Sequence, residues 1–87
     1  MQKVFDFYED CGHGWMKVKK DLLSKMEIAD KISSCSYERG EYAYLEEDGD
    51  LTTFCRAYKA MYGVDVKFKT HFSDRSRIRG YNRYETN

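Results

Sequence analysis

The sequence has no apolar run long enough to cross a membrane, no paired cysteines and no excess of charge of one sign. A membrane span needs roughly 18 consecutive apolar residues, and no stretch of the 87 residues approaches that length. Residues 1–6 lack the apolar segment that a secretory signal requires. We therefore expect a protein of the cytoplasm that does not bind membranes.

The cysteines are few and unpaired. Cys11, Cys35 and Cys55 form an odd set without short spacings, which excludes a disulfide framework and fits a reducing compartment. Structural zinc sites combine pairs of the Cys-x₂₋₄-Cys or His-x₃₋₅-His kind, whereas here only Cys11 and His13 are close in sequence. We predict no metal and no cofactor.

Charge is balanced in number but uneven along the chain. The sequence contains 15 basic and 15 acidic side chains, so attraction of the whole molecule to nucleic acid is not indicated. Acidic residues dominate between 31 and 63, and basic residues dominate between 64 and 87. Eight tyrosines and the complete absence of proline are the other unusual features. The chain therefore has an acidic middle and a basic end.

The hydrophobic pattern predicts alternating short strands and helices in one domain, residues 1–87. We predict strands over 4–8, 15–18, 32–37, 41–46 and 64–72, and helices over 21–26 and 51–62. Gly40 is suited to the turn of the 32–46 hairpin, while Asp50 and Gly63 are suited to the N-cap and the C-terminal stop of the long helix. Residues 73–87 show no period and are predicted to be a loose or edge segment.

These elements predict an α+β fold: a mainly antiparallel β-sheet of about five short strands, one long amphipathic helix packed on one face, and a short second helix. The helix has an apolar stripe that includes Leu51, Phe54, Tyr58 and Met61. The strand that follows alternates, with Val64, Val66, Phe68 and Phe72 on its apolar side. We expect these two apolar surfaces to pack together, leaving the other face of the sheet in water.

Two glycines surround a histidine in the segment Gly12-His13-Gly14 and predict a turn with backbone angles that other residues avoid. The segment lacks the Gly-Lys-Ser/Thr ending of a phosphate-binding loop. Cys11 with His13 or with His71 would form a nucleophile and base only if a third group oriented the imidazole and a pocket held substrate. No such motif is present, so we predict that the protein is not an enzyme.

Two charged segments are candidate contact surfaces. The carboxylates Glu41, Glu46, Glu47 and Asp48 lack the calcium-loop ligand series, and helix capping accounts for only part of them. The surplus is suited to a basic surface on a partner or to mimicry of phosphates.

The C-terminal segment interleaves cations and rings: Arg75, Arg77, Arg79, Tyr81 and Arg83. This composition is typical of single-stranded nucleic-acid binding and of protein–protein hot spots, and it also fits an ordinary solvated basic tail. Lys67 and Lys69 would extend the same basic surface.

The chain resembles small proteins of bacteriophages and mobile elements in which a Gly-His-Gly-Trp turn (residues 12–15) precedes a Ser-Tyr-x-x-Gly hairpin (36–40) and a Tyr-Leu-Glu-Glu-Asp segment (44–48). The resemblance covers about residues 5–80 and departs at Cys11, where the family pattern has proline. It implies a genomic setting, because such proteins often act stoichiometrically on host machinery, CRISPR nucleases included.

The sequence thus leads to two hypotheses. The first is a phage-type accessory protein in the host cytoplasm that binds and inhibits a host protein, for example a nucleic-acid-handling defence enzyme such as a CRISPR effector. The second is a nucleic-acid-binding module that uses the C-terminal arginines and tyrosine. The sequence leaves the oligomeric state open.

Overall fold

A computed structural model describes residues 4–85. Within this range the strands are β1 (Val4–Glu9), β2 (Gly14–Lys19), β3 (Tyr37–Arg39), β4 (Tyr42–Glu46), β5 (Lys67–Phe72) and β6 (Asn82–Arg83). The helices are α1 (Lys20–Lys25) and α2 (Asp50–Tyr62), with short 3₁₀ turns η1 (Ala29–Lys31) and η2 (Arg77–Gly80). None of these helices is long and apolar enough to cross a membrane.

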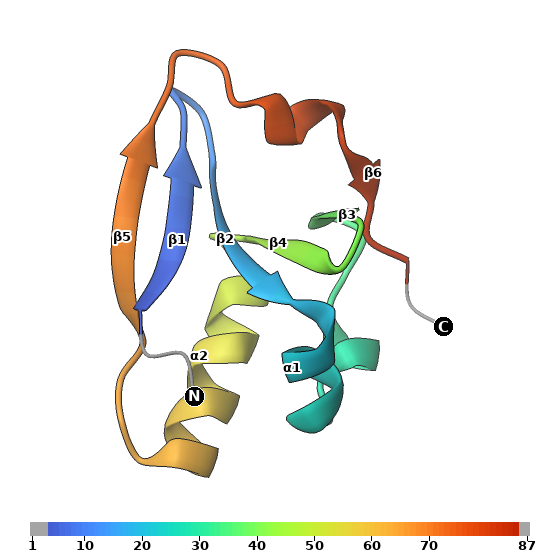
Figure 1. The fold of residues 1–87 in the computed structure, drawn as a ribbon, viewed down its shortest axis with the longest axis vertical. Coiled ribbons are helices and arrows are strands. Elements are labelled where there is room, and N and C mark those ends of the chain that lie inside the picture. Colours follow the sequence, from blue (N-terminus) through green and yellow to red (C-terminus); the bar gives the residue numbers. More distant parts are fainter. Residues whose placement is uncertain (1–3, 86–87) are drawn as a thin grey trace.

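The strands form one sheet in the order β5-β1-β2-β4-β3-β6 (Figure 1). All neighbours are antiparallel except β1 and β5, which run parallel with Phe5 opposite Phe68. The parallel pair arises because the chain crosses from β4 through α2 to the far edge of the sheet. The predicted α+β class, with a mostly antiparallel sheet, a long helix and a short one, is confirmed.

Helix α2 begins and ends close to the predicted positions. Gly63 ends it with φ +73°, and Gly40 supplies φ +60° at the β3–β4 turn, as the sequence indicated. The predicted N-cap role of Asp50 is wrong, because Gly49 occupies that position and Asp50 is the first helical residue.

The Asp50 carboxylate instead organises the segment before β3. It accepts hydrogen bonds from the backbone N–H and the hydroxyl of Ser33, at 2.8–3.1 Å, and from the hydroxyl of Ser36. These bonds hold residues 33–36 in a turn. The strand predicted over 32–37 is therefore reduced to β3, which begins at Tyr37.

Both helices pack on one side of the sheet, which we call the helical face. Phe5 of β1 lies 5.4 Å from the ring of Phe54 and 5.7 Å from that of Tyr58, edge to face in both cases. Leu23 of α1 and Leu45 of β4 are completely buried in the same core. This core supplies most of the apolar burial in the molecule.

The predicted packing of α2 on the strand over 64–72 is wrong except at Val66, which packs against the core that contains Phe54 and Tyr58. Phe68, Phe72 and Val64 remain 43%, 61% and 44% exposed, and Met61 of α2 is 48% exposed. The reason is topological: β5 lies at the edge of the sheet, so α2 packs on β1 and its inner neighbours instead. Phe68 keeps only a flank contact with Phe7, with ring centroids 5.6 Å apart.

Gly14 is needed for space rather than for an unusual backbone angle. The ring of Phe7, on the neighbouring strand, would lie 2.4 Å from a Cβ atom at this position. Neither Gly12 nor Gly14 adopts a positive φ, so the predicted reason for the two glycines is wrong. A close approach between β1 and β2 accounts for Gly14.

Candidate functional site

The other side of the sheet, which we call the aromatic face, is lined by rings and cations. Strand alternation and register place these side chains there: Asp6, Tyr8, Trp15, Lys17, Lys19, Tyr37, Arg39, Tyr42, Tyr44, Lys67, Lys69 and His71. Two cations of this face lie over aromatic rings. Lys17 Nζ is 4.2 Å from the centroid of the Tyr42 ring, and the Arg39 guanidinium is 5.1 Å from the centroid of the Tyr81 ring. The face is therefore aromatic and predominantly basic.

Residues 73–81, the covering segment, lie across this face. Ile78 of η2 forms a second buried cluster with Trp15 and Tyr44, and Tyr81 packs on Tyr44 with ring centroids 5.1 Å apart. The expectation that this face lies in water therefore holds for Lys67 and Lys69 of β5, which are exposed, and is wrong for Trp15 and Tyr44, which are buried. The covering segment has no apolar period because only Ile78 and Tyr81 enter the cluster.

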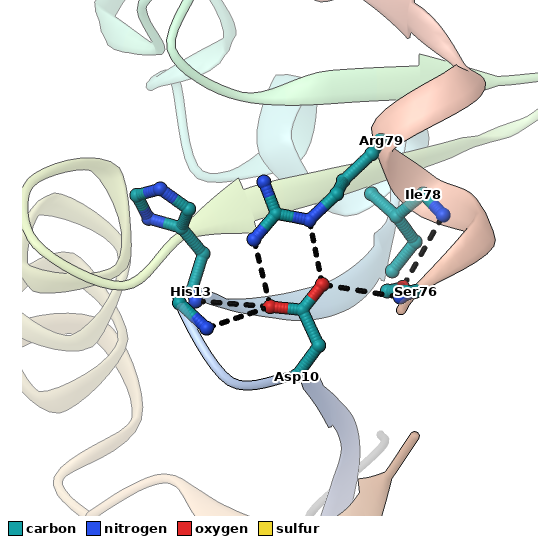
Figure 2. A network of polar contacts seen from close by, with 6 residues as sticks. Asp10, His13, Ser76, Ile78 and Arg79 are labelled. Carbon is teal, nitrogen blue, oxygen red and sulfur yellow. Dashed lines mark hydrogen bonds and ion pairs between the residues drawn. The ribbon is translucent and has the colours of Figure 1, made fainter. Parts of the chain in front are cut away.

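Asp10 fixes the covering segment to the β1–β2 turn (Figure 2). One carboxylate oxygen accepts the backbone N–H groups of Gly12 and His13, at 3.0 and 3.1 Å, and Arg79 Nη2 at 2.8 Å. The other accepts Arg79 Nε at 2.6 Å and the backbone N–H of Ser76 at 3.1 Å. The bidentate arginine pair joins parts of the chain that are far apart in sequence.

The electrostatics of the Asp10–Arg79 pair follow from its geometry. The Arg79 hydrogen bonds, opposed by burial and helped by three backbone N–H groups, hold the pKa of Asp10 far below its usual value. Asp10 in turn raises the pKa of Arg79. The guanidinium also lies 5.4 Å from the centroid of Trp15. Arg79 is thus committed to holding the fold together.

The chain beyond the covering segment is attached separately. The backbone N–H of Tyr84 donates to the carbonyl of Ser36 at 2.9 Å, and its hydroxyl donates to the carbonyl of Ala29 at 2.7 Å. Arg83 donates to the carbonyl of Ser34 at 3.2 Å and lies 4.8 Å from the ring centroid of Tyr37. These contacts place β6 at the sheet edge beside β3.

Between the covering segment and the sheet lies a groove of about 490 Å³, which we call the aromatic groove. Its lining comes from β1, β2, β4, β5 and the covering segment: Tyr8, Glu9, Lys17, Tyr44, His71, Phe72, Ser73, Arg75, Ser76, Arg77, Ile78 and Tyr81. Its volume falls within the range of about 300–1,000 Å³ typical of small-ligand sites.

The rings of the groove form a connected series. The His71 ring stacks on the Tyr8 ring, with centroids 4.8 Å apart and an interplanar angle of 19°. The Nε2 atom of His71 lies 2.9 Å from Asp6 Oδ1. Tyr8 meets Tyr44 edge to face at 6.5 Å. Burial raises the pKa of Tyr8, assisted by the charge of Asp6, and burial together with the neighbouring tyrosines raises the pKa of Tyr44 to about 12. Both hydroxyls are therefore neutral at pH 7.

The cations of the groove are accessible. Arg75 and Arg77 are exposed, and neither forms a hydrogen bond or an ion pair with any residue between 4 and 85. Lys17, which also lines the groove, lies over the Tyr42 ring. Glu9 is the one carboxylate in the described lining. The groove therefore presents uncommitted positive charge beside half-buried rings.

The structure divides the predicted C-terminal contact residues into two groups. Arg75, Arg77 and Tyr81 meet in the groove. Arg79 is held by Asp10, and Arg83 lies away from the groove on Tyr37. The proposal that all five act in one contact surface stays a prediction.

The predicted acidic residues are also divided. Glu46, Glu47 and Asp48 lie together at the β4–α2 connection, where the Glu46 carboxylate accepts the backbone N–H of Asp48 at 2.9 Å. We call these three residues the acidic turn. Glu41 precedes the first residue of β4, at the opposite end of a five-residue strand, so about 17 Å of backbone separates it from Glu46.

Among the groove residues that the sequence did not predict as site residues, Tyr8, Lys17, Tyr44 and His71 supply rings and a cation from the strands. The alternation of β1, β2, β4 and β5 would have placed each on the face opposite the core. What the sequence lacks is the strand order, without which these positions do not come together.

The cysteines and histidines do not converge. Cys11 and Cys35 are exposed, and burial raises the pKa of the half-buried Cys55 thiol. Residues 4–85 contain no group of three or more His, Cys, Asp or Glu side chains arranged to hold a metal ion. His71 is engaged elsewhere, with its Nε2 beside Asp6 and its ring stacked on Tyr8.

Comparison of the chain with protein-family models, curated proteins and solved structures found no match. Function is therefore inferred from the geometry of the groove and of the exposed surfaces.

Proposed function

We propose that the protein binds single-stranded nucleic acid in the aromatic groove. The observation that carries the proposal is the convergence of Tyr8, His71 and Tyr81 with the unpaired cations Arg75 and Arg77 on one groove. Single-stranded binders combine cations for phosphates with rings on which bases stack. Balanced net charge does not oppose this, because the positive charge is concentrated on one face.

The geometry favours a single strand over a duplex. Bases in a duplex are already stacked, whereas rings of the groove need unstacked bases as partners. The groove accommodates individual nucleotides rather than a double helix. Neutral tyrosine hydroxyls add hydrogen-bonding groups without repelling phosphates. No catalytic step is proposed, and no cofactor is required.

The test is a titration of a fluorescently labelled single-stranded oligonucleotide, followed by anisotropy at several salt concentrations. Replacing Arg75 and Arg77 by alanine is expected to weaken binding of every sequence. The slope of log K against log salt should fall by about 0.7 for each phosphate that the variant no longer neutralises. Replacing Tyr8 by leucine is expected to cost about 1–3 kcal/mol, the value of one base stack.

Lys25 and Lys31 provide the matched control. Both are exposed and lie on α1 and η1, on the helical side. The Lys25→Ala/Lys31→Ala variant loses the same charge but should bind as the native protein does. Equal weakening by the two double variants would show a diffuse charge effect and contradict the groove. Absence of binding by the native protein at low salt would reject the proposal.

A second candidate function follows from the acidic turn. Glu47 and Asp48 are exposed, and their carboxylates have no hydrogen bond or ion pair with any residue between 4 and 85. Helix α2 has its own first-turn carboxylate in Asp50. We propose that, if a host protein is the target, its basic surface contacts this turn, as expected of a phage-type inhibitor of a nucleic-acid-handling enzyme such as a CRISPR effector.

The Glu47→Lys/Asp48→Lys variant separates the two candidates. On the second candidate it abolishes inhibition of a purified CRISPR effector nuclease, while reversal of the exposed Asp21 and Asp30 has no effect. On the nucleic-acid candidate it strengthens oligonucleotide binding slightly, because repulsion is removed. Unchanged inhibition by the acidic-turn variant would exclude the turn as the contact.

A further inference from the structure

Strand β5 has an outer edge that no strand between residues 4 and 85 covers (Figure 1). Its inner edge pairs with β1, and beyond its end the backbone N–H of Ser73 donates to the carbonyl of Glu9 at 3.0 Å. Backbone groups of alternate residues point to opposite edges of a strand. Those of Lys67, Lys69 and His71 therefore point to β1, and those of Phe68, Thr70 and Phe72 point outward.

The side chains beside this edge are apolar on the helical side. Phe68 and Phe72, whose side chains lie on this side, are 43% and 61% exposed. Natural sheets usually protect an edge with charge, proline or a bulge. Here Lys67 and Lys69 point to the aromatic face, so they do not protect the helical side of the edge. That side presents two exposed aromatic rings beside backbone groups that pair with no strand of the part of the chain that the structure describes.

We propose that a second copy of this chain pairs with β5 through its own β5, antiparallel and centred on Thr70. A two-fold axis relates identical strands only in the antiparallel sense. In this register Thr70 lies opposite Thr70 of the second copy, and Phe68 lies opposite its Phe72. Every outward N–H and C=O group of the strand then forms a hydrogen bond, which neighbouring registers do not achieve.

Side-chain complementarity selects the same register. Two pairs cross the junction, each formed by Phe68 of one copy and Phe72 of the other, and such cross-strand aromatic pairs stabilise adjacent strands. On the other side Lys69 lies opposite His71, whose imidazole is bound to Asp6. A register centred on Lys69 would instead place two lysines opposite each other, which is unfavourable.

The small size of the contact favours weak, reversible association. Strand β5 has six residues and so spans about 20 Å. Together with the exposed apolar side chains this gives an interface at the small end of specific contacts, below about 1,200 Å². We therefore expect a reversible dimer whose population depends on protein concentration. The inference does not depend on the proposed function, because no nucleic acid takes part.

The first experiment is sedimentation equilibrium of the full chain over concentrations up to about 1 mM, where a weak contact is populated. The average mass should rise toward twice the chain mass. Thr70→Pro should keep the protein monomeric, since the ring blocks the outer edge but removes no bond to β1. Thr70→Val retains the outward N–H and should dimerise like the native chain.

The second experiment tests the register. In a Cys11→Ser/Cys35→Ser background, Thr70→Cys should form a disulfide-linked dimer under mild oxidation, because opposed residues of such a pair lie about 5.5 Å apart at Cα. Lys67→Cys, which would lie opposite Ser73, should cross-link far less. This arm decides the matter should Thr70→Pro prevent folding.

Three results would overturn the inference. A native chain that remains monomeric at every concentration has no such contact. A folded Thr70→Pro variant that still dimerises uses another surface. Equal cross-linking at positions 67 and 70, or none at 70, excludes the register.

Discussion

The two faces of the sheet are covered in different ways, and the difference separates stability from recognition. On the helical face, α1 and α2 bury a continuous set of apolar side chains around Phe5 and Phe54. On the aromatic face, a segment with little regular structure buries only Trp15, Tyr44 and Ile78. Burial of apolar side chains holds the helices on the helical face, whereas hydrogen bonds to the Asp10 carboxylate fix the covering segment on the aromatic face.

This contrast explains why the candidate site lies where it does. A face filled by close-packed apolar side chains has no room for a ligand. A face covered by one short segment leaves rings half-buried at the segment's margin, as Tyr8 and Tyr81 are. The groove exists because the covering segment covers this face incompletely. Substitutions on the helical face should therefore lower the stability of the whole domain, whereas substitutions on the aromatic face should act on the covering segment and the groove.

The largest effect is expected from Phe54→Ala on the helical face. Phe54 is completely buried, and its removal should lower the free energy of unfolding by about 3–5 kcal/mol. Met61→Ala is the matched control, since Met61 belongs to the same helix but is half exposed. Chemical denaturation measures both, and similar losses for the two variants would contradict the placement of α2.

A smaller and more local effect is expected from Asp10→Asn. The variant lacks the charge that holds Arg79, so the covering segment should detach while the helical core persists. Trp15, the single tryptophan, lies beneath Arg79 and reports on this change. We expect red-shifted fluorescence with a nearly unchanged far-ultraviolet circular dichroism spectrum. An unshifted tryptophan spectrum would show that the apolar cluster alone holds the segment.

The smallest effect is expected from acid. Arg79 lowers the pKa of Asp10, and the Lys20 hydrogen bond lowers the pKa of Glu38. Both ionised carboxylates therefore stabilise the folded state, fully above the ordinary range near pH 4 and progressively less as pH falls below it. The melting temperature measured against pH should fall in acid, and it should fall less steeply for the Asp10→Asn variant. An equally steep fall for both proteins would contradict the assigned role of Asp10.

Much of the fold could be predicted because it is encoded locally. The apolar stripe of α2, its end at Gly63 and the Gly40 turn depend on residues a few positions apart. The two glycine predictions are confirmed, and the stripe is confirmed except at Met61, which is exposed. The aromatic and basic character of the C-terminal segment is equally visible in the sequence, and it identifies Arg75, Arg77 and Tyr81 as candidates without knowledge of their neighbours.

The remainder depends on contacts between distant positions. Alternation shows that Phe68 and Phe72 share a side, but not that β5 lies at an edge where that side stays exposed. Similarly, Asp10 is one of many acidic residues in the sequence, and only the folded chain places it against Arg79. The groove residues of β1, β2 and β4 could not be grouped without the strand order.

The long sequence separation between Asp10 and its partners Ser76 and Arg79 also has a kinetic consequence. Its bonds to Ser76 and Arg79 join residues 66 and 69 positions apart, whereas the β3–β4 hairpin joins close neighbours such as Arg39 and Tyr42. Closing a long loop costs entropy before distant contacts can compensate, so such contacts form slowly. We therefore expect the hairpin and α2 to form early in refolding and the groove to close last, with the fluorescence of Trp15 lagging behind the recovery of helical structure.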